Sequence, residues 1–163
     1  QLYNYAQENN EYRGMGTTLV CAIIFDKEIV VANVGDSRSY VINQRRMDQI
    51  TSDHSFVNHL VMTGQITKEE AFNHPQRNII TKVIGTDKRV SPDLFIKKTQ
   101  FYDFLLLNSD GLTDYVRDYE IQEVLNEEAS LDDHGEKLLS LAMAHDSKDN
   151  VSFILSSLEG GKV

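Results

Sequence analysis

The sequence of 163 residues has little of three things that would each define a class of protein: cysteine, long apolar runs and positive charge. Its one cysteine, Cys21, cannot form an intrachain disulfide, and its place inside the apolar run 19–25 predicts a small core residue. No apolar stretch approaches the roughly 20 residues that cross a bilayer. The net charge of −9 argues against nonspecific nucleic-acid binding. We therefore expect one cytoplasmic domain, 1–163, with neither a membrane nor a nucleic acid as partner.

Several catalytic signatures are also missing. Ser37 and Ser109 lack the Gly-x-Ser-x-Gly elbow of serine hydrolases. The five histidines lack the spacing of zinc motifs, and no segment has the glycine pattern that cradles a phosphate. Each histidine is interpreted as a surface or turn residue, and His54 is the one that could line a cleft.

Acidic residues at the ends of apolar runs are the most informative feature present. The run 104–107 leads into Asn108-Ser109-Asp110-Gly111, Asp36 follows the run 29–34, and Asp149 precedes the run 151–155. A strand that ends in an acid holds its carboxylate at the edge of a sheet, and carboxylate oxygens are the ligands that Mg²⁺ and Mn²⁺ prefer. The alternative is that each acid merely forms a turn, since Asp-Gly, Gly-Asp and Asp-Asn are common turn sequences. Their joint occurrence favours a metal site.

The alternation of apolar and polar residues predicts strands over most of the chain. A hairpin is expected from 17–25 and 28–34, followed by strands near 39–42 and 47–50 that continue it as an antiparallel meander. Further strands are expected at 93–98, 101–107 and 151–158. Helices are expected at 118–127 and 131–145, the second with Ser130 as its N-cap and a stripe of leucines on one face.

A polar, helix-prone insertion interrupts the strands around 53–81, with breaks at Gly64 and Pro75. Long insertions are usually either functional or loosely ordered. Two interpretations stay open: a flap beside a cleft, or a solvated pair of helices that only links strands.

Five motifs in order carry a resemblance to a known family: Gly14-Met15-Gly16-Thr17-Thr18, Val34-Gly35-Asp36-Ser37-Arg38, Thr51-Ser52-Asp53-His54-Ser55, Asn108-Ser109-Asp110-Gly111-Leu112-Thr113-Asp114 and Asp149-Asn150-Val151-Ser152. Together they resemble the metal-dependent serine/threonine protein phosphatases (PPM, type 2C). The segment 57–67 is similar to the flap of small bacterial members.

The resemblance implies a fold, an activity and a set of ligands. The fold class is α+β, an antiparallel β-sandwich flanked by helices in four layers, αββα. The activity is hydrolysis of phosphoserine and phosphothreonine in proteins by a metal-activated water, which reverses signalling by serine/threonine kinases. Asp110 and Asp149 match the acids of a two-ion Mn²⁺ or Mg²⁺ centre, and Asp36 with Asp110 matches a third, weaker ion site. Asn150 is expected to support Asp149, and Arg38 to form a structural ion pair. Asp114 is expected to stabilise its turn, with the orientation of a metal-bound water as the alternative.

The sequence departs from this family at its start. Residues 1–13 contain neither the Asp-Gly-x-Gly-Gly-His-like motif, whose aspartate bridges the two ions, nor the arginine that binds the substrate phosphate. We therefore expect the fold to be incomplete at the N-terminus, with catalytic residues of this chain unknown and the chain alone poorly active or inactive. Open sheet edges predict a dimer or domain swap. The alternative function is a noncatalytic, phosphatase-like module that binds phosphoproteins.

Overall fold

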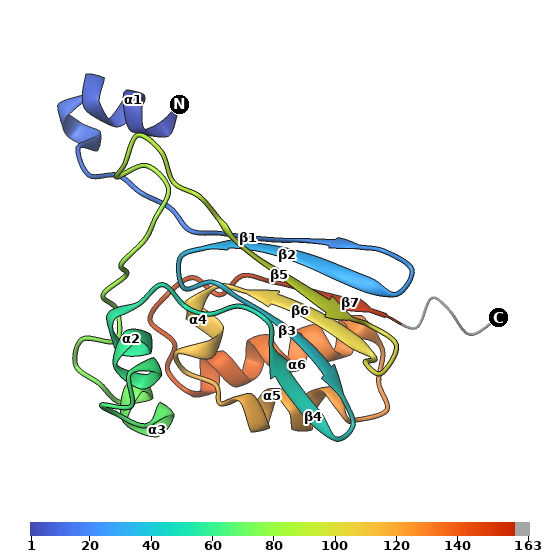
Figure 1. Ribbon diagram of the computed structural model, residues 1–163. Helices are drawn as coiled ribbons and strands as arrows, with labels where there is room; N and C mark the ends of the chain where they lie inside the picture. Colours follow the sequence, from blue (N-terminus) through green and yellow to red (C-terminus); the bar gives the residue numbers. More distant parts are fainter. Residues whose placement is uncertain (159–163) are drawn as a thin grey trace.

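The computed structural model describes residues 1–158, which form two stacked antiparallel sheets with helices on one side (Figure 1). The first sheet has the strand order β1-β2-β5, and the second has the order β4-β3-β6-β7. The strands are β1 (Leu19–Ile24), β2 (Glu28–Val34), β3 (Arg38–Asn43), β4 (Arg46–Gln49), β5 (Asp93–Lys98), β6 (Phe104–Asn108) and β7 (Phe153–Ser157). The predicted α+β class and the expected strands are confirmed within these bounds.

The predicted meander is wrong at one point. β1 and β2 form the expected hairpin, with Cys21 opposite Ala32, but β2 pairs next with β5 and not with β3. Between β2 and β3 the chain crosses from one sheet to the other through residues 35–37. This crossing places the Asp36 loop at the edge between the two sheets.

The core lies in two clusters. One fills the space between the sheets, where Ile29 and Val31 of β2 meet Val41 of β3 and Leu105 of β6. The other lies between the second sheet and its helices, around Tyr40, Leu106 and Leu138. β6 therefore contributes to both, as its apolar run 104–107 predicts for a strand that is buried on both faces.

Helices α5 (Asp118–Leu125) and α6 (Leu131–Ala144) cover the outer face of the second sheet. Ser130 caps α6 as predicted, because its hydroxyl accepts a hydrogen bond from the Asp133 amide. The predicted leucine stripe is only partly buried: Leu138 is buried while Leu139 is exposed. His134 corrects another prediction, since it is 1% exposed and its Nε2 bonds to the Glu127 carbonyl.

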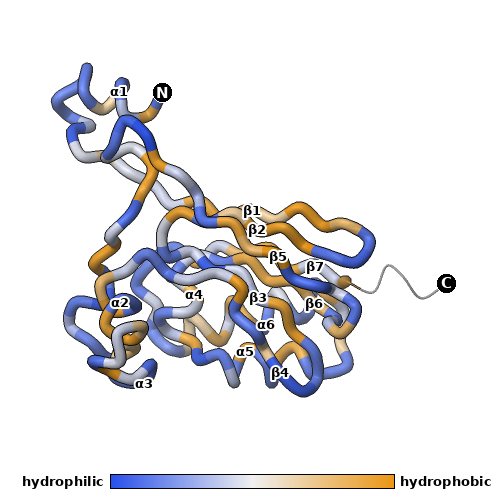
Figure 2. The backbone as a smooth tube through the Cα atoms, viewed as in Figure 1, coloured by the Kyte–Doolittle hydropathy of each residue, from blue (hydrophilic) through white to orange (hydrophobic). Residues whose placement is uncertain are grey.

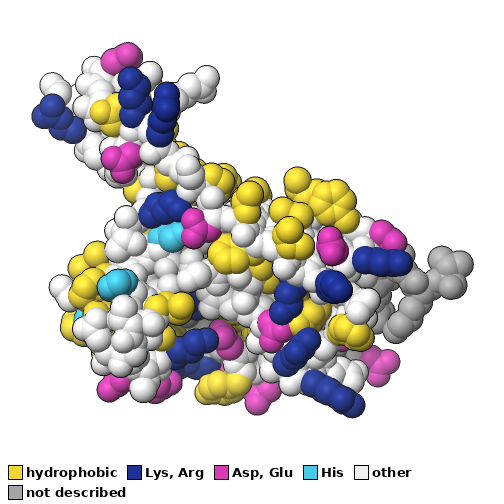
Figure 3. Space-filling view, in the orientation of Figure 1, with side chains coloured by type: hydrophobic (Ala, Val, Ile, Leu, Met, Phe, Trp, Pro, Cys, Tyr) yellow, Lys and Arg dark blue, Asp and Glu magenta, His cyan; other side chains and the backbone are white. Residues whose placement is uncertain are grey.

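The outer face of the first sheet is apolar and uncovered. Strand register brings Cys21, Ala32 and Leu94 into one row and Ile23, Val30 and Ile96 into the next. Leu94 and Ile96 are 68% and 69% exposed, and Cys21 is exposed, contrary to the core position predicted for it. Hydrophobic colour runs along β1 and β2 in Figure 2. Hydrophobic side chains gather over this sheet in Figure 3. Within residues 1–158, three of the four expected layers are present.

The remaining helices lie at one end of the sandwich (Figure 1). They are α1 (Leu2–Glu8) with the short 3-10 turn η1 (Asn10–Tyr12), α2 (Phe56–Met62), α3 (Lys68–Phe72) and α4 (Asp110–Thr113). The insertion around 53–81 thus contains two helices, α2 and α3. None of the helices described is long and apolar enough to cross a membrane.

Candidate functional site

Asp110 is placed by the end of β6. The strand stops at Asn108, and α4 begins at Asp110, so the carboxylate leaves a rigid strand at the first residue of a helix. The Asn108 side chain fixes this turn, because its Nδ2 donates to the Ser109 carbonyl at 2.8 Å and to Thr113 Oγ1 at 3.1 Å. The Asp114 amide donates to the Asp110 carbonyl at 2.8 Å, and the Asp114 carboxylate lies 3.7 Å from Arg77 Nε.

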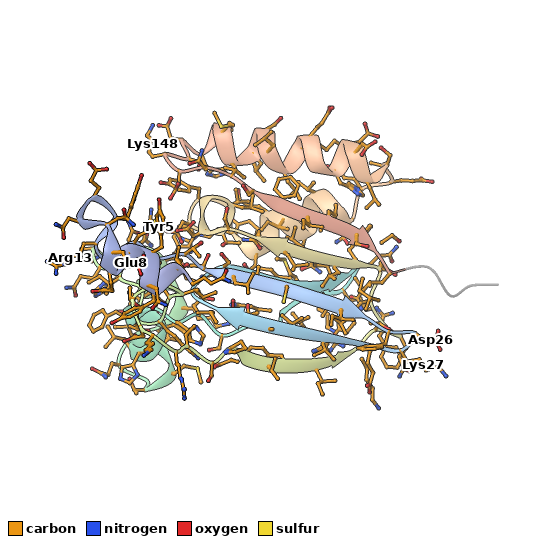
Figure 4. All side chains as sticks on the ribbon, turned by 90° about the horizontal axis from the view of Figure 1, so that it is seen from above. Tyr5, Glu8, Arg13, Asp26, Lys27 and Lys148 are labelled. Carbon is orange, nitrogen blue, oxygen red and sulfur yellow. The ribbon has the colours of Figure 1, made fainter. Side chains whose placement is uncertain are left out.

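The Asp149 loop packs directly on α4. Ser147 Oγ donates to the Gly111 carbonyl at 2.9 Å, and Ser109 Oγ donates to the Asn150 carbonyl at 3.2 Å. A side chain at position 111 would collide with that same Asn150 carbonyl, so glycine allows the close approach. Asn150 supports Asp149 through its backbone, whose N–H donates to Asp149 Oδ1 at 2.7 Å. Figure 4 shows Lys148, the preceding residue, at the end of the sandwich opposite Asp26 and Lys27.

Asp36 follows a strained turn at the end of β2. Gly35 has φ +110°, a conformation that side-chain-bearing residues rarely adopt, and a Cβ there would collide with Thr18. The Gly35 carbonyl accepts from Asn33 Nδ2 at 3.2 Å and from the His54 amide at 3.0 Å. The turn therefore has one defined geometry, which aims Asp36 at the cavity described next.

Asp36 and Asp110 line one cavity of about 390 Å³. Its other wall comes from α2 and α3, through Val57, Val61 and Phe72. The insertion around 53–81 therefore closes one side of a cavity that contains two of the three predicted metal ligands. Asp149 is not among the residues that line this cavity.

The three acids nevertheless share one electrostatic environment. Burial and the nearby Asp110 raise the pKa of Asp36 to about 6. Burial and the charge of Asp149 raise the pKa of Asp110. Asp110 thus interacts electrostatically with both of the other acids. In each pair, the negative charge on one carboxylate disfavours ionisation of the other. Such mutual repulsion is what a bound cation would relieve, so these carboxylates fit a site for hard divalent ions.

The arrangement is not a complete cage of protein ligands. Among residues 1–158, no group of three or more His, Cys, Asp or Glu side chains gathers closely enough to hold an ion by itself. Mg²⁺ commonly binds through one or two carboxylates and several waters, so a pair such as Asp110 and Asp36 remains compatible with this chemistry.

Arg38 forms a structural ion pair, as predicted. Its Nε and Nη2 donate to Asp53 at 2.9 and 2.7 Å, and its Nη1 donates to Tyr40 Oη at 3.1 Å. Asp53 also accepts from Gln49 at 2.8 Å. Both Arg38 and Asp53 line the cavity, and among residues 1–158 no salt bridge pairs the Asp36 carboxylate with a cation.

Two arginines that the sequence interpretation did not single out join the insertion to the site. Arg77 donates through Nη1 to the carbonyls of Phe72 and Asp114, at 3.0 and 3.3 Å. Arg117 binds both carboxylate oxygens of Glu69, and its guanidinium lies 3.3 Å from the centre of the Phe72 ring. Their partners are 5 to 48 residues away in the sequence, so no local motif indicates these contacts.

Comparison with known proteins supports the resemblance. Residues 1–60 match the family model described as protein phosphatase 2C. The chain is 40% identical over 155 residues to the serine/threonine phosphatase stp of Listeria welshimeri. That match covers 95% of this chain and 62% of the relative, so the chain spans about three fifths of the relative's length.

Solved structures agree with this assignment. Serine/threonine phosphatase Stp1 from Staphylococcus aureus is 71% identical, with a TM-score of 0.96, over 98% of this chain and 63% of that one. The catalytic domain of the phosphatase PstP, solved with two manganese ions, is 31% identical with a TM-score of 0.82, over 94% and 64% of the two chains. These matches support membership of the protein phosphatase 2C family, and the relatives named above with their organisms are bacterial.

Proposed function

We propose that this chain is part of a metal-dependent phosphatase that removes phosphate from phosphoserine and phosphothreonine in proteins. The observation that supports this best is the group of three acids, in which the partly buried Asp110 is electrostatically coupled to the partly buried Asp36 and to the exposed Asp149. The names of the relatives agree with an enzyme and do not favour the noncatalytic binding module.

Asp110 and Asp149 are proposed as ligands of the two-ion centre, and Asp36 with Asp110 as ligands of a third ion. Bound Mn²⁺ or Mg²⁺ would supply Lewis acidity that makes water a nucleophile near neutral pH and offsets charge on the phosphoryl oxygens. The residues of this chain hold the carboxylates in place through the Gly111–Asn150 contact and the Gly35 turn. The chain alone is proposed to bind ions weakly and to hydrolyse little.

The insertion around 53–81 is proposed to act as a flap within a single domain, 1–163. Its contribution of Val57, Val61 and Phe72 to the cavity wall supports this role over that of a simple link between strands. The proposed substrates are cytoplasmic targets of a serine/threonine kinase, because hydrolysis of the same phosphoester reverses the kinase's product.

The test is Mn²⁺-dependent hydrolysis of a phosphothreonine peptide by the natural protein that contains this chain. Asp110→Asn should reduce kcat/KM by at least about a hundredfold, since it removes a ligand on which the ion site depends. Asp26→Asn is the matched control. It makes the same chemical change at the exposed turn between β1 and β2, at the opposite end of the sandwich (Figure 4), and should leave kcat/KM unchanged.

Two results would count against the proposal. One is equal activity of the Asp110→Asn variant and the unmodified protein. The other is a natural protein that binds Mn²⁺ yet hydrolyses no phosphopeptide over a range of ion concentrations, which would return attention to the binding module.

A further inference from the structure

His54 is hydrogen-bonded to the turn that carries Asp36 through two reciprocal bonds. The His54 backbone N–H donates to the Gly35 carbonyl at 3.0 Å, and the Gly35 N–H donates to His54 Nδ1 at 2.9 Å. The two residues are 19 positions apart, so this pairing is tertiary. It holds the N–H and the carbonyl of Gly35, which belong to the peptide units before and after that residue, and the second of these units leads directly into Asp36.

The chemistry of these bonds selects one form of the imidazole. An amide N–H can only donate, so Nδ1 must accept and carries no proton. The ring of a neutral histidine then has its proton on Nε2, which lies 3.2 Å from Asp93 Oδ2 and donates to it. Asp93 is itself held by Lys82 Nζ at 2.7 Å.

His54 also joins three separate parts of the fold. Asp93 begins β5, which lies beside β2 in the first sheet. The His54 carbonyl accepts from the Thr81 amide at 2.7 Å, where the insertion returns to the sandwich. The ring is therefore oriented from the side of β5, and the backbone is oriented from the end of the insertion.

We propose that His54 is a positioning residue for Asp36: its unprotonated Nδ1 fixes the Gly35 N–H and so the turn that sets the direction of the Asp36 carboxylate in the cavity. Gly35 needs such support because glycine has no side chain to limit its backbone, and its φ of +110° is a conformation that other residues rarely adopt. The importance of this direction for ion binding rests on the proposed function, whereas the geometry of the turn does not.

Two substitutions separate the roles of the two ring nitrogens. In His54→Asn, the side-chain oxygen takes the place of Nδ1 and can still accept from Gly35. In His54→Gln, the side-chain amide takes the place of Nε2 and reaches towards Asp93. The acceptor that Nδ1 offers to the Gly35 N–H is lost. Both variants remove the imidazole ring. If His54 acted only through the packing of this ring, the two substitutions would therefore change the Gly35 turn by the same amount.

The readout is made first on the metal-free chain. Hydrogen exchange of the Gly35 amide should become at least about tenfold faster in His54→Gln and change by less than about threefold in His54→Asn. The affinity for Mn²⁺, measured by calorimetry on the natural protein, should fall about tenfold in His54→Gln and be largely kept in His54→Asn, as is typical when support for a ligand is removed. Equal effects of the two substitutions on Gly35 would overturn the proposal.

The unmodified chain provides a measurement that does not depend on the folding of any variant. Long-range ¹H–¹⁵N correlation spectra of the imidazole should show a proton on Nε2 and none on Nδ1 at neutral pH. A proton on Nδ1 would overturn the proposal, because the Gly35 bond could not form. If the Gly35 readings hold but the natural protein hydrolyses no phosphopeptide, then the proposed function fails and the positioning of the turn stands.

Discussion

Position 111 accepts only glycine, because there is no space for a Cβ atom. A Cβ there would collide with the carbonyl of Asn150, in the loop that brings Asp149 towards Asp110. We therefore expect Gly111→Ala to force the loop away and to lower the free energy of unfolding by about 1–3 kcal/mol, the usual cost of overpacking. Urea denaturation measures this change.

A second glycine provides the control for that prediction. Gly135 lies inside α6, and a Cβ there would be 3.7 Å from Phe153, an ordinary contact. Gly135→Ala should therefore raise the free energy of unfolding by about 0.5–1 kcal/mol, since alanine favours the helix. A loss of stability at both positions would show that the Asn150 contact is not the cause at position 111.

The charge of Asp36 should lower the stability of the metal-free chain. Burial, and then the charge of Asp110, raise its pKa from 3.8 to about 6. Between these two pH values the folded state binds the proton more tightly than the unfolded state does. The free energy of unfolding is therefore highest, with respect to this group, below about pH 4 and falls as the pH rises through about 6. Asp36→Asn should raise the free energy of unfolding at pH 7.5 by about 1–2 kcal/mol, allowing for partial exposure, and should give no gain at pH 3.5.

Thermal unfolding at the two pH values checks this prediction, with and without Mn²⁺. Added Mn²⁺ should stabilise the unmodified chain more than the variant, because only the former keeps the carboxylate. An equal gain from Asp36→Asn at pH 3.5 and 7.5 would mean that its charge is not responsible.

The individual acids could be predicted from the sequence, but their supporting contacts could not. Asp36, Asp110 and Asp149 each adjoin an apolar run, and that local pattern is visible in the sequence. The bond between His54 and Gly35 spans 19 residues, and the bond between Arg117 and Glu69 spans 48. Such contacts depend on how the elements pack, which no local pattern encodes.

At the scale of elements, α3 is attached to the start of α5 by Arg117. This side chain binds Glu69 with two hydrogen bonds and lies over the Phe72 ring, both on α3. Arg117→Ala should speed hydrogen exchange in α3 by about threefold to tenfold, while global unfolding changes by less than about 1 kcal/mol, since exposed ion pairs contribute little. Exchange measured by mass spectrometry reports this difference.

Lys137→Ala is the control for the attachment of α3. It removes a comparable exposed ion pair, with Glu127, which follows the C-terminal end of α5, whereas Arg117 precedes its start. Exchange in α3 should stay unchanged in this variant. If both variants speed exchange in α3 equally, the effect comes from general loss of stability and not from release of α3.

The strands themselves were predictable, but their division between sheets was not. Alternating apolar residues indicate where β2 and β3 lie, and a short connection between two strands usually indicates a hairpin. Residues 35–37 instead carry the chain from one sheet to the other. The positive φ of Gly35 makes that crossing, and only the pairing of β2 with β5 reveals it.

At the scale of the whole molecule, Cys21 shows that a local sequence pattern does not predict which face of a sheet is covered. An apolar run predicts burial, but whether a sheet face is buried depends on what covers it. The rows that contain Cys21 and Ile23 are apolar on all three strands, and no helix among residues 1–158 runs across them (Figure 4). Exposed apolar patches of this kind favour association.

The last prediction is that the chain as given self-associates through this face. Ile96 lies in this patch, on the edge strand β5, and is 69% exposed. Ile96→Lys should therefore place a charge within the contact, shift sedimentation towards the monomer and raise the dissociation constant at least about tenfold. Met62→Lys is the control, because Met62 is 74% exposed but lies on α2, away from the sheet. Association that survives Ile96→Lys and is lost in Met62→Lys would place the contact on the insertion around 53–81 instead. A monomer at high concentration in the unmodified chain would show that the uncovered sheet tolerates water without a partner.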